Sequence, residues 1–329
     1  MMDTQRQYSM LVICWIVYSA SLQLAVTSST QSVRRYRCGD VTSALTLITH
    51  SSRDSDVVYA AGHNRVCKMR VADGAETLLT TVNIGTPKVL LENPALPQTL
   101  LVCGSDGNGR CLMLNTASAH LNQTPVTSDR VYGRAVGPES VAAVFTRAYL
   151  GTTGQNVSAL FVAKQPAGLP HDEPIISARQ LVPNGSSSYS LNIVKEQDGD
   201  GTYERKINSM YGHNYAINYT HGFSYRSFVF FVTVQRTSVT ETSHLTTRLA
   251  RVCTSNDNFY SYAEIELQCT SSGQYEPPRL EVTRHAVAQS AYLHGDSNEA
   301  ALFVVFGQAS SLVATRPDTS RGSGEFVLV

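Results

Sequence analysis

The run over residues 228–235 constrains the fold of this chain more than any other segment. Its residues are almost all aromatic or β-branched, a composition that suits a pleated strand buried on both faces and suits a helix poorly. A polar segment follows, and over residues 245–252 apolar and polar side chains alternate before Cys253, as in a half-buried partner strand. The two runs predict an antiparallel hairpin with a long loop, whose first strand is central in a sheet.

The overall composition favours an all-β fold. Hydrophobic residues make up 42% of the 329 residues, which is ample for a buried core. Val, Thr, Tyr and Ser abound, whereas Glu-, Lys- and Leu-rich helical stretches are nearly absent. Lys+Arg and Asp+Glu both number 26 and no long run of one sign occurs, so the charge distribution gives no support for nucleic-acid binding.

Hairpins recur along the chain at uneven spacing, separated by Gly, Pro and Asn turns. The predicted pairs are 57–61 with 66–71, 99–103 with 110–115, 141–146 with 159–164, the 228–235 hairpin with 262–267, and 301–307 with 325–329. Successive small sheets of this kind favour a β-propeller, and a two-sheet sandwich is the alternative. We expect residues 166–190 to form a loop and residues 197–204 a polar surface tip.

The N-terminus has the order of a signal peptide. Arg6 precedes an apolar run over residues 10–17, which small and apolar residues continue to Val26. We therefore assign residues 1–28 to a signal peptide, with cleavage near residues 25–29. The alternative is an uncleaved membrane anchor, but the apolar run is shorter than the roughly 20 residues that a span requires. As it stands, the chain is expected to be secreted.

Secretion determines how the cysteines are interpreted. Cys14 would leave with the signal peptide, and an even number remains to pair in an oxidising compartment. These are Cys38, Cys67, Cys103, Cys111, Cys253 and Cys269. Cys103 and Cys111 close a glycine-rich turn at the ends of paired strands, so we predict a disulfide between them. Asn122, Asn156, Asn184 and Asn218 lie in N-glycosylation sequons and are candidate glycosylation sites.

Catalytic and metal-binding motifs are missing from the sequence. It contains no G-x-S-x-G, H-E-x-x-H, P-loop or paired Cys-x-x-Cys motif. Residues 198–204 have the composition of a calcium loop without EF-hand spacing, and we interpret them as a solvated turn. His213 and His221 each lie beside a glycine and are interpreted as loop histidines. We therefore predict no enzyme, cofactor or metal site.

Several of these segments together resemble the sema domain of plexins and of the hepatocyte growth factor receptor group. They are Cys103-Gly-Ser with Cys111, residues 228–235, Arg251-Val-Cys253 leading to Phe259-Tyr-Ser-Tyr262 and Cys269, Val58-Tyr-Ala-Ala-Gly62 with Asn64-Arg65, and residues 301–308. The resemblance extends over roughly residues 41–329, and we assign residues 38–329 to this domain. It implies a seven-bladed β-propeller, of which the chain would supply about the first four or five blades, incomplete at its C-terminus.

The sequence departs from the family pattern at some cysteines. Residues 82–97 carry none, and the strand around Phe326 also lacks one. In the family, cysteines that match Cys253 and Cys269 bridge to partners further along the chain, so here these two would pair with each other or stay unpaired. Cys38 and Cys67 have no clear counterpart, and a bridge between them is expected from parity alone.

The resemblance implies the extracellular ligand-binding region of a plexin-like receptor. A semaphorin-type protein ligand would contact mainly the third and fourth blades, over about residues 141–269, and would gather receptors into a homo-oligomer. The membrane would be reached only through a segment absent from this chain, which places the domain on the extracellular side of the plasma membrane, or secretes it if the chain ends at Val329. The alternatives are a kinase-type growth-factor receptor, suggested by Val234-Gln-Arg236, and a secreted sema-domain protein.

Overall fold

The structure is a computed structural model in which the described residues form β-strands, turns and bends, with no α-helix among them. The described residues are 11–16, 34–36, 45–50, 54–73, 75–96, 98–106, 109–117, 123–128, 136, 141–150, 155–165, 175–185, 188–193, 204–205, 215, 217–238, 243–254, 261–268, 286–295, 299–308 and 326–328. The expectation of an all-β chain is confirmed.

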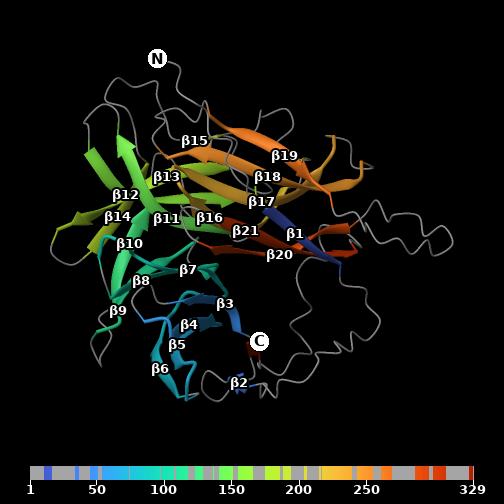
Figure 1. Cartoon of the computed structure of the whole chain (residues 1–329). Helices are drawn as coiled ribbons and strands as arrows, with labels where there is room; N and C mark the ends of the chain where they lie inside the picture. The colour runs from blue at the N-terminus through green and yellow to red at the C-terminus, as the bar shows by residue number, and fades with distance from the viewer. Residues whose placement is uncertain are drawn as a thin grey trace.

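Consecutive strands form antiparallel sheets that follow one another around the molecule (Figure 1). We call four of them blades 1 to 4. Blade 1 consists of β3 (Leu45–His50), β4 (Val57–Gly62), β5 (Arg65–Arg70) and β6 (Glu76–Thr81). Blade 2 consists of β7 (Pro87–Glu92), β8 (Thr99–Gly104), β9 (Cys111–Asn115) and β10 (Gln123–Ser128). Blade 3 consists of β11 (Val141–Leu150), β12 (Gln155–Lys164), β13 (Ile176–Asn184) and β14 (Ser188–Ile193), with β15 (Glu204–Arg205) beside β13. Blade 4 consists of β16 (Ile217–Tyr225), β17 (Phe228–Arg236), β18 (Leu245–Cys253) and β19 (Ala263–Leu267).

Two further sheets complete the described strands. Blade 5 has β20 (Ala286–Gly295), β21 (Ala300–Gln308) and β1 (Leu11–Ile16), and a separate pair joins β2 (Arg34–Tyr36) to β22 (Phe326–Leu328). Blades 2 and 3 are not separate sheets, because their outer strands β10 and β14 pair in parallel. That pairing makes one nine-stranded sheet out of the two blades and β15.

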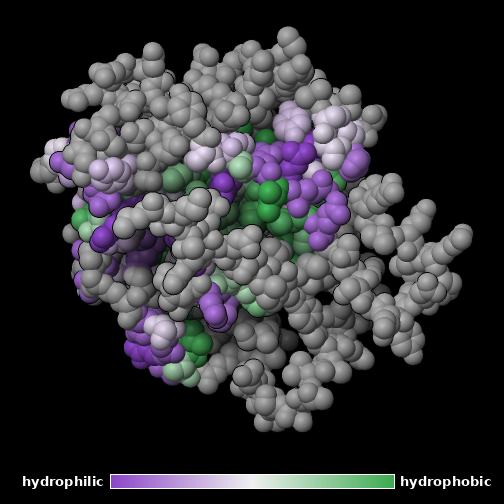
Figure 2. Space-filling model, turned by 45° about the horizontal axis from the view of Figure 1, so that its top comes forward, coloured by the Kyte–Doolittle hydropathy of each residue, from purple (hydrophilic) through white to green (hydrophobic). Residues whose placement is uncertain are grey.

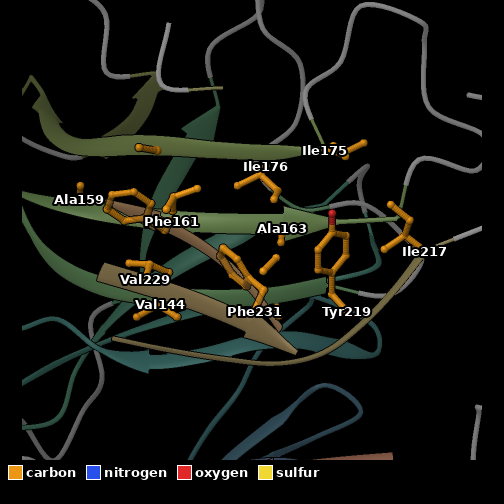
Figure 3. Close-up of a cluster of buried hydrophobic side chains, with 14 of the residues drawn as sticks. Val144, Ala159, Phe161, Ala163, Ile175, Ile176, Ile217, Tyr219, Val229 and Phe231 are labelled. Carbon is orange, nitrogen blue, oxygen red and sulfur yellow. The ribbon is translucent and has the colours of Figure 1, made fainter. Parts of the chain in front are cut away.

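The hydrophobic core lies between successive blades, which is the packing expected for radially arranged sheets. Representative buried members are Tyr59 and Leu100 between blades 1 and 2, Met113 and Leu160 between blades 2 and 3, Phe161 and Phe231 between blades 3 and 4, and Leu249 and Phe306 between blades 4 and 5. Figure 3 shows the cluster of blades 3 and 4, to which β12 contributes Phe161 and the neighbouring strands β16 and β17 contribute Tyr219 and Phe231. Each blade thus needs its neighbours to bury both faces.

The aromatic run predicted to be a central strand is β17. It pairs with β16 on one side and with β18 on the other. Val229 and Phe231 point toward blade 3, whereas Val232 and Val234 belong to the cluster shared with blade 5. Since both faces are covered, a nearly continuous run of aromatic and β-branched residues is stable here.

Two strand predictions are wrong. Residues 301–307 do not pair with residues 325–329, because β21 pairs with β20 while β22 pairs with β2. The β20–β21 turn needs only four residues, and a short loop costs less entropy to close than a long one. The segment 166–190 is not all loop, because β13 and the start of β14 lie within it. Its buried polar residues Ser177 and Arg179 interrupt the apolar pattern that would have indicated a strand.

The N-terminal apolar segment contributes strand β1. Residues Leu11–Ile16 pair in parallel with Ala301–Phe306 of β21. The signal peptide over residues 1–28 and its cleavage remain predictions. Among the described residues, no helix is both long enough and apolar enough to cross a membrane.

Candidate ligand-binding region

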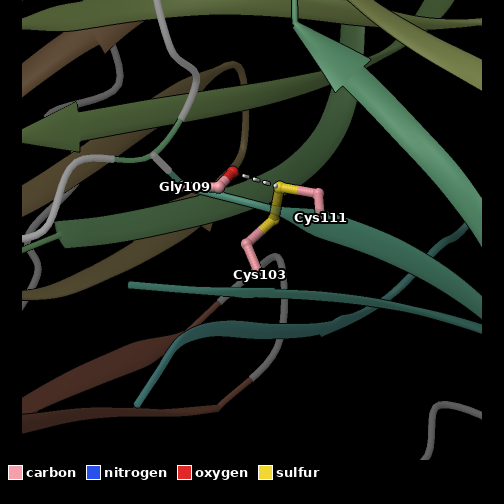
Figure 4. The surroundings of a disulfide bond; sticks show 3 residues. All are labelled: Cys103, Gly109 and Cys111. Carbon is pink, nitrogen blue, oxygen red and sulfur yellow. Dashed lines mark hydrogen bonds between the residues drawn. A yellow bond between two sulfur atoms is a disulfide. The ribbon is translucent and has the colours of Figure 1, made fainter. Parts of the chain in front are cut away.

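The disulfide between Cys103 and Cys111 lies inside the packing of blades 2 and 3. The two residues face each other across the β8–β9 pair, their sulfurs are 2.03 Å apart, and both residues are almost fully buried. The Cys111 sulfur also lies 3.6 Å from the Gly109 carbonyl oxygen (Figure 4). Because a disulfide sulfur carries no proton, we regard this as a contact and not as a hydrogen bond. The bridge ties together the two central strands of blade 2.

Of the other four cysteines that we expect in the secreted chain, Cys67 and Cys253 are among the described residues. Cys67 is buried in β5 and is disulfide-bonded, whereas Cys38, its expected partner, lies outside the described residues. Cys253 ends β18, half-buried, and its backbone N–H donates a hydrogen bond of 2.8 Å to the Ser261 hydroxyl. Cys269 lies outside the described residues. The bridge between Cys38 and Cys67 therefore remains a prediction, as do both alternatives for Cys253 and Cys269, which would pair with each other or stay unpaired.

Three of the four sequon asparagines are described. Asn156 in β12 and Asn184 at the end of β13 are exposed, and Asn218 in β16 is half-buried. Asn122 lies outside the described residues. Exposure of an asparagine is required for glycan attachment, so Asn156 and Asn184 are placed most favourably. Their modification remains a prediction.

Blades 3 and 4 are joined at one end by backbone hydrogen bonds. The N–H of Tyr149 at the end of β11 donates to the carbonyl of Thr254 at 3.1 Å. The N–H of Thr254 donates in turn to the carbonyl of Ser227, in the β16–β17 turn, at 2.9 Å. These bonds bring the end of β11, the β16–β17 turn and the end of β18 to one edge, which we call the blade 3–4 rim.

The blade 3–4 rim presents aromatic and arginine side chains. Tyr149 is 42% exposed. The Arg226 guanidinium lies 5.0 Å from the centroid of the Tyr225 ring, and that of Arg251 lies 4.7 Å from the Phe228 ring. Both arginines are exposed, and each is held over a ring by cation–π attraction. Tyrosine and arginine are the residue types that most often dominate protein–protein interfaces.

Arg226 adopts an unusual backbone conformation at the tip of this rim. Its φ is 54°, in a region that L-residues with long side chains rarely occupy. Arg226 and Ser227 form a two-residue turn between β16 and β17, and such turns demand positive φ, a position that glycine usually fills. The stacking of Arg226 on Tyr225 offsets part of this cost.

A polar network lies behind the rim, on the face of blade 4 that packs against blade 3. The Glu264 carboxylate accepts hydrogen bonds from Gln235 at 2.8 Å, from Arg248 at 2.9 Å and from the Tyr262 hydroxyl. The Tyr215 hydroxyl donates to the carbonyl of Arg236 at 2.8 Å. Partly buried polar and charged groups stabilise a fold only when each of them is hydrogen-bonded. Here three side chains donate hydrogen bonds to the Glu264 carboxylate.

Burial changes the pKa of several groups near the network. Burial raises the pKa of Tyr219, and the negative charge of Glu264 raises it further. The pKa of Tyr215 is also raised, mainly by burial. Burial is the largest single influence on the pKa of the Arg248 guanidinium and lowers it, but the hydrogen bond to Glu264 and the surrounding charges, that of Glu264 foremost, together raise it overall. Both tyrosines are therefore neutral and Arg248 is charged at physiological pH.

The sequence did not predict this network. Tyr215, Arg248 and Glu264 are separated by many residues in the chain, and no local motif links them. The only signal is the alternation of acidic and apolar residues in β19, Ala263–Leu267, which places Glu264 and Glu266 on one face. Whether this face of β19 is turned toward blade 3 depends on the order of the strands in the sheet, which the sequence does not specify.

The histidine and calcium-loop segments show no site among the described residues. His221 is not a loop residue, as we had expected, but lies in β16 opposite Val232. His213 and residues 198–203 lie outside the described residues, and Glu204 belongs to β15. Within the described part of the chain, no group of three His, Cys, Asp or Glu side chains is arranged to hold a metal ion.

Figure 2 shows one face of the molecule by hydropathy. On this face the described hydrophobic side chains gather in a small group that is bordered by hydrophilic ones. The large exposed hydrophobic residues of the described chain include Leu96, Tyr149, Ile265 and Tyr292. They come from different blades, and single exposed residues of this kind are normal for a protein surface.

Comparison with known proteins relates this chain to plexins. No family model matches it. Its sequence is 28% identical to Plexin-A3 of Homo sapiens over 288 residues, which cover 82% of this chain and 14% of that protein. It is 26% identical to Plexin A3 of Danio rerio over 249 residues, which cover 66% of this chain and 12% of the relative. The chain thus spans only a small part of the length of these relatives.

The fold of this chain is also similar to that of a plexin whose structure has been solved. The extracellular region of Plexin A4 matches with a TM-score of 0.62 and 20% sequence identity, covering 84% of this chain and 33% of that chain. The fold is therefore a β-propeller of the sema type. In both sequence and fold, the chain thus resembles the sema domain of plexins.

Proposed function

We propose that this protein is the extracellular ligand-binding region of a plexin-like receptor and that it binds a semaphorin-type protein through blades 3 and 4. The observation that carries the proposal is the plexin-like fold together with sequence similarity along most of the chain. A sema domain of this kind acts by recognition, so we propose a binding role and no catalysis. The location proposed is the extracellular side of the plasma membrane.

The blade 3–4 rim supports this part of the surface as the contact region. It combines an exposed tyrosine, Tyr149, with two arginines that stack on aromatic rings, Arg226 and Arg251. Planar side chains held in place lose little conformational entropy on binding. The polar network of Glu264 and the core between blades 3 and 4 hold the rim on a rigid support.

The similarity to plexins favours the plexin type over the kinase-type growth-factor receptor, since the relatives named above are plexins. A secreted sema-domain protein would use the same binding surface. The two forms differ in membrane attachment, and the binding proposal is common to both.

The proposal is tested with the full chain, secreted from eukaryotic cells and immobilised, against a soluble semaphorin dimer in a surface plasmon resonance assay. Saturable binding is expected. Arg251→Glu and Tyr149→Ala are each expected to weaken affinity by about tenfold or more, as central interface residues do.

Arg70→Glu in blade 1 is the matched charge-reversal control, because Arg70 is exposed and forms a local ion pair with Asp73 at 3.1 Å. Its affinity is expected to stay within about twofold of the unaltered chain. Absence of any semaphorin binding would contradict the proposed ligand class. Equal loss in the rim variants and in the control would contradict the proposed surface.

A further inference from the structure

The sequon asparagine Asn156 lies directly beside the rim residue Tyr149. Asn156 in β12 is the cross-strand partner of Tyr149 in β11. Directly paired residues of an antiparallel ladder project from the same face of the sheet, with Cβ atoms about 4.5 to 5.5 Å apart. Both residues are exposed, Tyr149 by 42%. A group attached to the Asn156 side chain therefore starts next to the Tyr149 ring.

The Asn156 side chain points away from the core between blades 3 and 4. Its neighbours in the same hairpin, Ala148 and Val157, are cross-strand partners and pack in that core. Successive side chains of a strand point to opposite faces, so Tyr149 and Asn156 occupy the other face. At this tip of the hairpin both residues are exposed, and a glycan on Asn156 is accommodated without displacing buried side chains.

The second exposed sequon, Asn184, projects from the opposite face of the same sheet. Gln180 in β13 is the cross-strand partner of Ala159, which is buried in the core between blades 3 and 4. Asn184 follows Gln180 by four residues and shares its face, whereas Asn156 precedes Ala159 by three residues and lies on the other face. Strand β12 also separates β13 from β11. Of these two sequons, Asn156 is therefore the one next to Tyr149.

We propose that an N-glycan on Asn156 crowds the blade 3–4 rim and lowers its affinity for a protein ligand. A glycan is bulky and lies on the surface. A partner that packs on Tyr149 must restrict the motion of this glycan, which costs binding free energy. Occupancy of the sequon then sets the ligand affinity of the chain. The effect on affinity rests on the proposed function, whereas the shielding of Tyr149 does not.

Two variants remove the glycan by different routes. Asn156→Gln removes the attachment point, and Ser158→Ala removes the hydroxyl that completes the sequon. The Ser158 hydroxyl is buried and has no hydrogen-bond partner among the described residues, so its removal breaks no hydrogen bond. An effect common to both variants belongs to the glycan. Asn184→Gln, which removes the sequon on the opposite face, is the matched control.

Shielding of Tyr149 is measured without any ligand. The full chain is secreted from eukaryotic cells, and treatment with a peptide-N-glycosidase followed by mass spectrometry shows whether Asn156 carries a glycan. Enzymatic iodination of Tyr149 should be at least about twofold faster in both variants, since the glycan starts beside the ring. Tyr292 in β20, 56% exposed, should react at one rate in all chains. An unoccupied Asn156, or equal iodination of Tyr149 in all chains, overturns the inference.

The effect on affinity is measured by surface plasmon resonance with a soluble semaphorin dimer. Asn156→Gln and Ser158→Ala are each expected to bind about threefold or more tightly than the unaltered chain, and Asn184→Gln should stay within about twofold of it. Unchanged affinity in the first two variants contradicts the effect on affinity and leaves the proposed ligand class standing. If no form of the chain binds semaphorin, the proposed function is wrong and the effect on affinity with it, and the iodination rates alone decide whether the glycan shields Tyr149.

Discussion

Arg248 and Glu264 form an ion pair of 2.9 Å across neighbouring strands of blade 4, with 29% and 21% of their side chains exposed. The same Glu264 oxygen accepts a hydrogen bond from Gln235 in β17 at 2.8 Å. One carboxylate therefore ties the outer strand β19 to β18 and to the central strand β17. Among the described strands of blade 4, β19 is an edge strand with a single neighbour, so these side-chain bonds add to one backbone ladder.

Glu264→Ala is expected to lower the free energy of unfolding by about 1 to 3 kcal/mol. The substitution leaves the Arg248 guanidinium and the buried Gln235 amide without their acceptor, and a partly buried charge without a partner is destabilising. Urea denaturation of the full chain, followed by tyrosine fluorescence and circular dichroism, measures the change.

Glu266→Ala is the control for this substitution. Glu266 lies on the same strand but is exposed, and its removal is expected to change stability by no more than about 0.5 kcal/mol. If Glu266→Ala lowers the free energy of unfolding as much as Glu264→Ala does, then the negative charge on β19 stabilises the chain and the hydrogen-bond network of Glu264 does not.

Gly109→Ala is expected to destabilise the chain by about 3 kcal/mol. Gly109 has a φ of 89°, and a Cβ placed there would lie 2.0 Å from the Val136 carbonyl oxygen. Alanine would thus incur both the left-handed backbone penalty and a clash with a neighbouring backbone, beside the buried disulfide. Thermal and urea unfolding of the variant give the magnitude.

Gly185→Ala separates these two effects. Gly185 also has a positive φ, 69°, but a Cβ there meets nothing within 4 Å. Only the backbone penalty applies, so we expect a loss of about 1 to 2 kcal/mol. If both variants lose the same amount, the close approach at Gly109 contributes nothing.

The strands that were predictable from the sequence are those whose pattern reflects both covered faces. Residues 228–235 and 245–252 correspond to β17 and β18, because aromatic and β-branched residues face packed neighbours there. Strand β13 was missed because buried Ser177 and Arg179 give it a polar appearance. The parallel pairing of β10 with β14 joins strands more than fifty residues apart, and no local pattern specifies such a contact.

The candidate site was predictable only in outline. The resemblance indicated blades 3 and 4, but the rim depends on Tyr149 and Thr254, which meet through a backbone hydrogen bond between different blades. The rim thus arises from the packing of blades and not from any short motif.

Replacing the disulfide with the double variant Cys103→Ala/Cys111→Ala is expected to cost about 2 to 3 kcal/mol of stability. The bridge closes a loop with a sequence separation of 8, and the chain-entropy model gives about this value for so short a loop. Denaturant unfolding of the double variant and of the unaltered chain, both without reductant, measures the difference in the free energy of unfolding. A loss below about 1 kcal/mol would contradict the entropic account.

The same disulfide is expected to resist reduction in the folded chain. Cys103 and Cys111 are 0% and 2% exposed, so a thiolate can attack only after local opening. Mass spectrometry after dithiothreitol and iodoacetamide treatment should find this pair unlabelled under native conditions and labelled in urea. Rapid labelling without denaturant would show that blades 2 and 3 open readily.

The stability of blade 4 is expected to decrease as the pH falls below about 7, through His221. This residue is half-buried in β16, and its ring stacks on Phe223 with centroids 6.1 Å apart. Burial lowers the pKa of His221 below its ordinary value of 6.5. The unfolded chain therefore binds a proton at this position more readily than the folded chain does, and proton uptake favours unfolding. The loss begins near the unfolded pKa and is complete once the pH falls below the lowered folded value.

His221→Gln removes this proton uptake, so its free energy of unfolding should change less between pH 7.5 and 5 than that of the unaltered chain. His294→Gln, at an exposed position of β20, is the control and should follow the unaltered chain over the same range. The test is a series of urea denaturations at fixed pH values, in which the difference between each variant and the unaltered chain cancels the contribution of the other histidines. A parallel pH dependence in His221→Gln would show that His221 stays uncharged in both states or charges equally in both, and would contradict its burial as the cause.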